Sequence, residues 1–153
     1  MKSIIFLAVL PLSILASCTS GSKGSEETKT GDSLTVEFIG SAPLDIKNPE
    51  GKVQLYAVAE NIADVPATLL EEKNIQQSGV PFTIDFVLPK DHKSHIKPAV
   101  AAHEAVKYYV TVKWDSDGNG KVEKGDIMID YDKQFPNVKL GAGKQQVYLT
   151  VIK

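Results

Sequence analysis

Residues 115–126 are the twelve positions of this sequence with the clearest chemical potential: Asp-Ser-Asp-Gly-Asn-Gly-Lys-Val-Glu-Lys-Gly-Asp. A calcium loop of the EF-hand type takes oxygen ligands from positions 1, 3, 5, 7, 9 and 12, and it bends sharply at a glycine in position 6. Gly120 stands at position 6 of this loop. The ligand positions hold Asp115, Asp117, Asn119, Lys121 through its carbonyl, Glu123 directly or through a water, and Asp126. The spacing therefore predicts a Ca²⁺ site.

The segments on both sides of this loop predict strands rather than the helices of an EF-hand. Residues 106–114 and 127–131 are rich in β-branched and aromatic residues and alternate in polarity. A calcium sensor swings its helices apart, and strands bonded into a sheet cannot do so. We therefore expect a static, structural calcium site. The alternative is a polar hairpin turn at residues 117–120, although such a turn requires neither Asp115 nor Asp126.

A second set of possible metal ligands lies in residues 90–104. His92 and His95 have a His-x-x-His spacing, which can present two imidazoles to one transition-metal ion. His103 follows, with Asp91 and Glu104 as acidic neighbours of the histidines. A lysine-rich loop lacks the defined scaffold of a zinc site, so we prefer to interpret these as surface histidines.

The sequence shows no catalytic constellation. It has no Gly-x-Ser-x-Gly elbow and no glycine-rich phosphate loop that opens a helix. Asp130 and Asp132 lie two residues apart, on one face of a predicted strand. We interpret them as two solvated carboxylates on the surface of a sheet and not as a catalytic pair. We therefore expect no enzymatic activity.

The N-terminal residues predict a membrane anchor. Residues 1–17 have a short basic start and an apolar stretch that is too short to span a bilayer, as in a signal peptide. Their end, Leu-Ala-Ser-Cys at 15–18, resembles the lipobox of bacterial lipoproteins. That resemblance implies cleavage before Cys18 and attachment of acyl chains such as palmitate to it. The alternative is an ordinary secretory peptide with a stray cysteine.

Residues 18–32 predict a flexible linker between the lipid and the fold. After the cysteine they contain no large apolar residue, so they cannot bury enough surface to become ordered. Lipoproteins kept in the inner membrane carry Asp after the acylated cysteine, whereas Thr19 stands here. This points to the outer membrane of the cell envelope, at its periplasmic or surface face. Cys18 is the only cysteine, so the fold must form without a disulfide.

Residues 33–153 predict one all-β domain. With a net charge of −2 and interspersed signs, nothing suggests a nucleic-acid partner, and we expect none. About seven alternating runs without a long helical period predict an antiparallel β-sandwich with transthyretin-like or immunoglobulin-like connections. Residues 68–77 also fit a helix, and one helical turn is expected after Pro98. The predicted strands are residues 34–39, 52–59, 68–77, 80–88, 106–114, 127–131 and 145–152.

The middle of the chain resembles the YbaY-type lipoproteins, which are grouped with the pilotin-like lipoprotein chaperones of type III secretion. The most specific pieces are the Asp-Val-Pro-Ala turn at 64–67 and the strand at 81–89. The resemblance implies a small anchored β-sandwich without enzymatic activity, which in the chaperone branch helps an outer-membrane secretin to reach its site. The acidic loop at 115–126 departs from that family. The resemblance rests on residues 53–59, 63–73, 79–89 and 108–112.

The sequence therefore favours two functions. The first is a membrane-tethered binding or accessory domain that serves an envelope protein or binds a ligand. The alternative is a pilotin-like chaperone, which requires an exposed groove or edge strand to capture a partner segment. An enzyme is the least favoured class.

Overall fold

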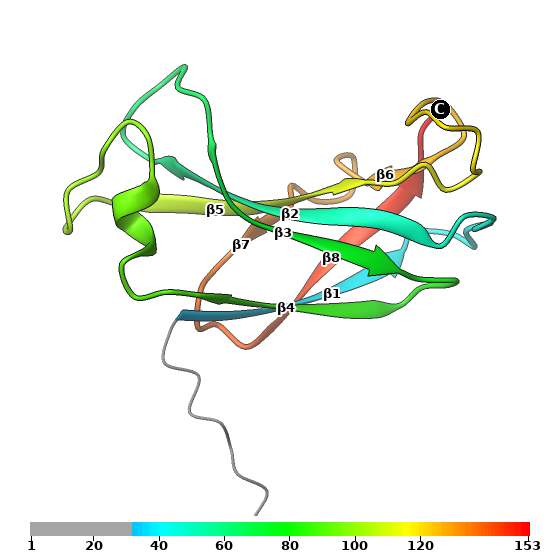
Figure 1. Ribbon diagram of the computed structural model, residues 1–153, viewed down its shortest axis with the longest axis horizontal. Coiled ribbons are helices and arrows are strands. Elements are labelled where there is room, and N and C mark those ends of the chain that lie inside the picture. Colours follow the sequence, from blue (N-terminus) through cyan, green and yellow to red (C-terminus); the bar gives the residue numbers. More distant parts are fainter. Residues whose placement is uncertain (1–31) are drawn as a thin grey trace, which may run out of the picture.

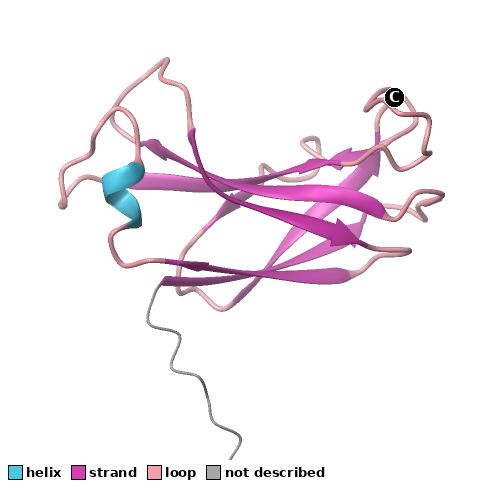
Figure 2. Ribbon diagram, in the orientation of Figure 1, coloured by secondary structure: helices cyan, strands magenta, loops and turns pink. Residues whose placement is uncertain are grey.

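The computed structural model describes residues 32–153, so the predicted signal peptide, the predicted lipidation site at Cys18 and residues 19–31 lie outside the described residues. The described chain forms two four-stranded sheets that pack face to face (Figure 1), which confirms the predicted β-sandwich. Figure 2 shows one short helix beside the strands. The elements are β1 (Asp32–Gly40), β2 (Glu50–Ala59), β3 (Thr68–Gln76), β4 (Phe82–Leu88), η1 (His92–His95), β5 (Val106–Lys113), β6 (Ile127–Ile129), β7 (Asn137–Val138) and β8 (Lys144–Val151).

The strand order is β4-β1-β8-β6 in one sheet and β3-β2-β5-β7 in the other. We call them the β1 sheet and the β2 sheet. Neighbouring strands are antiparallel except β1 and β8, which run parallel with Phe38 opposite Val147. Parallel neighbours cannot be joined by a tight hairpin, and here the rest of the domain connects them. The antiparallel prediction therefore holds for every neighbouring pair but this one.

One face of each long strand is buried between the sheets, as an alternating pattern predicts. In β1 the fully buried residues are Val36 and Phe38, and in β2 they include Val53 and Leu55. These side chains meet Phe86 and the other inward residues in one hydrophobic core. Because burying such a side chain contributes about 1.5–3 kcal/mol, this core is the main source of stability for the domain.

Strand β3 resolves the ambiguity of residues 68–77 in favour of a strand. It pairs with β2 along its length, and a bulge between Leu55 and Tyr56 shifts the register. Ile75 is buried in the core, whereas Leu69 stays exposed. A helix would have left the backbone of β2 without a partner on this side. Tertiary pairing therefore outweighs the helical propensity of the segment.

Two small elements differ from the predictions. The helical turn in the long connection is η1, which lies before Pro98 and not after it. The turn closes where the Asp91 carbonyl accepts the Ser94 N–H at 2.8 Å. Strand β7 was not predicted, since two residues are too short to show a period. Among residues 32–153, no helix has the length and apolar character needed to cross a membrane.

Candidate functional site

The acidic loop, residues 115–126, connects β5 to β6, and a buried tryptophan holds its N-terminal end in place. Trp114 is fully buried, and its indole N–H donates to the Asn48 carbonyl at 2.8 Å. The Asn48 amide in turn donates to the carbonyl of Asp115 at 2.8 Å. The indole packs nearly perpendicular to the ring of Phe82, with 6.0 Å between the ring centroids. The first ligand position is therefore attached directly to the core.

Asp126 closes the other end of the loop. Its side chain is 0% exposed, and Oδ1 accepts the Ser116 N–H at 2.8 Å, the Ser116 hydroxyl at 3.2 Å and the Asp117 N–H at 3.2 Å. Its Oδ2 accepts the Glu123 N–H at 2.8 Å. The Ser116 hydroxyl oxygen also accepts the Ile127 N–H at 3.1 Å. The Asp126 carboxylate thus connects both the beginning of the loop, at Ser116, and its later part, at Glu123, to the start of β6.

Opposing effects act on the pKa of Asp126. Burial raises the pKa, because the charged form loses water, whereas the N–H groups of Glu123, Asp117 and Ser116 and the Ser116 hydroxyl lower it. The hydrogen bonds outweigh the burial, and the pKa lies below its ordinary value. Asp126 is therefore a carboxylate at neutral pH.

Asp115 organises the bend of the loop. Its Oδ1 accepts the N–H groups of Gly118 and Asn119, both at 3.0 Å, and its Oδ2 accepts the Gly120 N–H at 2.8 Å. Gly120 has a φ of 91°, in the left-handed region that favours glycine. The predicted bend at Gly120 is therefore confirmed.

Three of the predicted ligands come together. The ligand atoms of Asp115, Asp117 and Asp126 all lie within 4.8 Å of one another. Asn119 lies beside them, with its amide nitrogen 3.0 Å from Asp117 Oδ2 and 3.4 Å from Glu123 Oε1. The Glu123 side chain is exposed and is not part of the three-carboxylate group.

The remaining predicted ligand is the carbonyl of Lys121. Its residue is exposed, and its N–H donates to Asn119 Oδ1 at 2.9 Å. Of the six predicted calcium ligands, the structure therefore brings the three aspartates together.

The donor set fits a hard cation. A carboxylate oxygen has two lone pairs, and Oδ2 of Asp115 and Oδ2 of Asp126 each accept one hydrogen bond within the loop. Both oxygens of Asp117 also accept one each. These oxygens therefore keep acceptor capacity for an ion, whereas Oδ1 of Asp126 is already saturated. Asp126 would bind Ca²⁺ through one oxygen rather than two, which is consistent with weak affinity.

The histidines of residues 90–104 do not gather into a metal site. His92 is buried, with Nδ1 2.9 Å from the Pro89 carbonyl oxygen and Nε2 2.8 Å from the Tyr108 hydroxyl. Because a carbonyl can only accept, Nδ1 carries a proton, and in the neutral ring Nε2 accepts from the Tyr108 hydroxyl. Both ring nitrogens are engaged, while His95 and His103 are exposed. The surface-histidine interpretation is therefore wrong for His92 alone.

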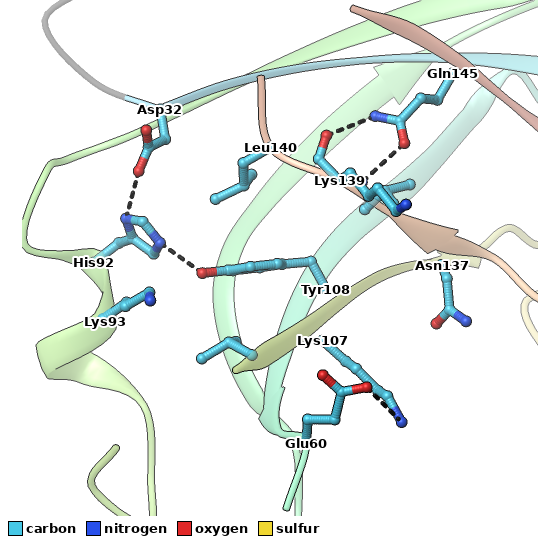
Figure 3. Close-up of a pocket in the computed structure, with 12 residues that line it drawn as sticks. Asp32, Glu60, His92, Lys93, Lys107, Tyr108, Asn137, Lys139, Leu140 and Gln145 are labelled. Atoms are coloured by element: carbon cyan, nitrogen blue, oxygen red, sulfur yellow. Dashed lines mark hydrogen bonds and ion pairs between the residues drawn. The ribbon is translucent and has the colours of Figure 1, made fainter. Parts of the chain in front are cut away.

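A cavity of about 570 Å³, which the sequence did not predict, lies next to His92 (Figure 3). It opens at the end of the sandwich where β1 begins, between residues of both sheets and η1. Burial and the nearby Asp32 carboxylate raise the pKa of Tyr108, which keeps its hydroxyl protonated for His92. The lining residues come from distant parts of the sequence, so no local pattern marks them.

No family model and no curated protein matches the sequence. Among solved structures, the chain is similar to an alternative pilotin from the type II secretion system of Vibrio cholerae. The TM-score is 0.49 and the identity is 15%, over 79% of this chain and 96% of that chain. A likeness at this score and identity transfers neither family nor function, so the resemblance to YbaY-type lipoproteins stays a prediction.

Proposed function

We propose that this protein is a lipid-anchored, non-enzymatic accessory domain of the bacterial cell envelope, whose β5–β6 loop binds Ca²⁺ as a structural ion. The observation that carries the calcium part is the group of three carboxylates within 4.8 Å of one another. Mutual repulsion of these charges would be relieved by a hard cation with oxygen ligands. The anchoring part is supported by the lipobox pattern at residues 15–18.

The two ends of the sandwich differ in a way that suits such a domain. The chain enters the fold at Asp32, and the acidic loop lies at the opposite end of the sheets (Figure 1). A calcium-bound loop would therefore be held away from a membrane anchor at Cys18. It would stabilise the end of the domain that faces outward, where an envelope partner can reach it.

Calcium should bind weakly and raise the melting temperature. We expect a dissociation constant of about 0.1–1 mM, as in extracellular calcium modules, with poor competition by Mg²⁺. At about ten times the dissociation constant the folded state gains about 1.4 kcal/mol, which corresponds to about 5 °C for a domain of this size. The measurement is a calcium titration of the purified protein by thermal unfolding. Terbium luminescence sensitised by Trp114, which directly precedes Asp115, gives a second signal.

Asp117→Asn is the matched control for this titration. The Asp117 side chain bonds only to the Asn119 backbone and amide within the loop, so the change removes a ligand charge without opening the fold. We expect about tenfold weaker calcium binding and an unchanged melting temperature without calcium. If neither protein responds to about 10 mM Ca²⁺, well above the expected range, the loop is a polar turn and the calcium proposal fails.

Anchoring should depend entirely on Cys18. Because only the thiol can take the diacylglycerol, Cys18→Ser should move the protein from the membrane fraction of its native cells to the soluble fraction. Ser17→Ala, which keeps the small residue before the cysteine, should leave the membrane fraction unchanged. Fractionation after a salt wash measures this. A Cys18→Ser protein that still sediments with membranes would contradict the lipoprotein assignment.

The pilotin-like chaperone is the second candidate, and a groove between two edge strands favours it. Strands β3 and β4 are edges of the two sheets, so each presents unpaired backbone groups on one side. Between them lies a groove of about 250 Å³ whose apolar lining includes Leu69, Leu70 and Leu88. An extended partner segment could pair with such an edge and place side chains in the groove.

The membrane-bound protein can separate the two candidates. Cross-linking in native envelopes, followed by recovery of the anchored protein, identifies partners of wild type and of Leu69→Lys. Leu69 is exposed at the groove, so lysine there should leave the fold intact. Loss of an outer-membrane secretin from the variant supports the chaperone. Retention of every partner supports the accessory domain.

A further inference from the structure

The cavity beside His92 has the composition of a binding site for an amphiphilic ligand. Its volume of about 570 Å³ lies in the range of small-molecule pockets. Val106, Val138 and Leu140 line it with apolar surface, and Lys93 and Lys139 stand among its polar lining residues. Figure 3 shows Lys93 extending toward the ring of Tyr108, with Leu140 on the other side of the space. Polar and apolar groups thus face one cavity.

The charged side chains that line the cavity have a positive net charge. Lys107 pairs with Glu60 at 3.5 Å, so these two charges compensate each other. Asp32 lies 3.5 Å from Nδ1 of His92, which also donates to the Pro89 carbonyl. None of the salt bridges formed within residues 32–153 uses Lys93 or Lys139. With three lysines and two carboxylates in the lining, the net charge is +1, since 3 − 2 = 1.

The walls of the cavity are held in place before any ligand arrives. The Gln145 side chain accepts the Lys139 N–H and donates to the Lys139 carbonyl, both at 2.8 Å. This pair of bonds fixes the turn between β7 and β8 that carries Leu140. On the opposite side the Tyr108 hydroxyl is held by Nε2 of His92 at 2.8 Å. A site that is rigid in advance loses less entropy on binding.

We propose that this cavity binds an amphiphilic anion, with a carboxylate or phosphate head near Lys93 and Lys139 and a short alkyl chain against Val106, Val138 and Leu140. A further hydrogen-bonding group is the Tyr108 hydroxyl, which donates to His92 and keeps a lone pair that can accept a hydrogen bond from Lys93 or from a phosphate head that retains one proton. The proposal depends neither on calcium nor on the lipid anchor, because η1 and the starts of β1 and β5, which line the cavity, lie at the end of the sandwich opposite to the acidic loop (Figure 1).

Titration with soluble octyl compounds tests the proposal. We expect octanoate and octyl phosphate to bind and to shift the backbone amide NMR signals of Lys93, Tyr108 and Leu140. Octyltrimethylammonium, octanol, acetate and inorganic phosphate should bind at least about tenfold more weakly, because each lacks the anionic head or the chain. Octanoate and octyl phosphate distinguish a fatty acid from a phospholipid-like ligand, and a preference for either supports the proposal.

Variants locate the two halves of the ligand. Lys93→Gln and Lys139→Gln should each weaken octanoate binding by about two- to five-fold, the scale of an exposed ion pair, while leaving octanol unaffected. Leu140→Ala should weaken both compounds. Lys97→Gln, an exposed lysine outside the cavity lining, is the control and should change neither. Equal binding of octyltrimethylammonium, or shifted signals outside the cavity alone, would overturn the proposal.

Discussion

Asp126→Asn should lower the free energy of unfolding by about 2–3 kcal/mol in calcium-free solution, whereas Asp117→Asn should change it by less than about 0.5 kcal/mol. The buried Asp126 carboxylate accepts three backbone N–H groups and one hydroxyl. An amide in its place turns one acceptor into a donor, which leaves at least one N–H group of the loop, buried or partly buried, without a partner. Denaturant unfolding with a chelator at about pH 7 measures the difference.

The same variant should also change the acid sensitivity of the protein. The pKa of Asp126 is lowered in the folded state, so its contribution to stability is complete above its ordinary pKa and is lost as pH falls through the folded pKa. Asparagine does not titrate. The gap between wild type and Asp126→Asn should therefore shrink as pH falls below the ordinary pKa of aspartate, about 4. A gap that is constant with pH, or an equal loss for Asp117→Asn, would show that Asp126 does not act through its charge.

Trp114→Ala should be the most damaging single change to the fold, with a loss of about 3–5 kcal/mol. The indole is 0% exposed and packs edge-on against Phe82. It also lies so close to Gly51 that an added Cβ there would be 2.9 Å from its Cγ. Alanine would leave a cavity at the junction of β2, β5 and the acidic loop, and the Asn48 carbonyl would lose its donor.

Circular dichroism during denaturant unfolding can measure this loss, since the variant has no tryptophan to report it. Phe135→Ala is the control, because Phe135 is 60% exposed and its removal should cost less than about 1 kcal/mol. If Trp114→Ala costs no more than the control, the indole does not anchor the loop. Calcium should also bind the variant more weakly, since Asp115 would lose its fixed position.

Local sequence patterns predicted most of the β-sandwich and the bend of the acidic loop at Gly120. Alternation in β1, β2, β4 and β8 shows which side chains face inward, because successive residues of a strand point to opposite faces. The glycine at position 120 and the acidic spacing from Asp115 to Asp126 also depend only on neighbours in the chain. Such features can be read from the sequence because their cause is local.

Other features depended on which segments meet in space. The alternation of apolar and polar residues shows that β1 and β8 are strands, but it does not show that these two strands pair in parallel. The sequence suggested Asp126 as a ligand, whereas the fold makes it the buried acceptor that closes the loop. The Tyr108 hydroxyl finds His92 only because η1 packs beside β5. The partners of Asp126 are three to ten residues away, but no period shows which way its side chain turns once the loop folds. The His92–Tyr108 bond and the cavity arise from long-range packing, so the tertiary structure decided these roles and the position of the cavity.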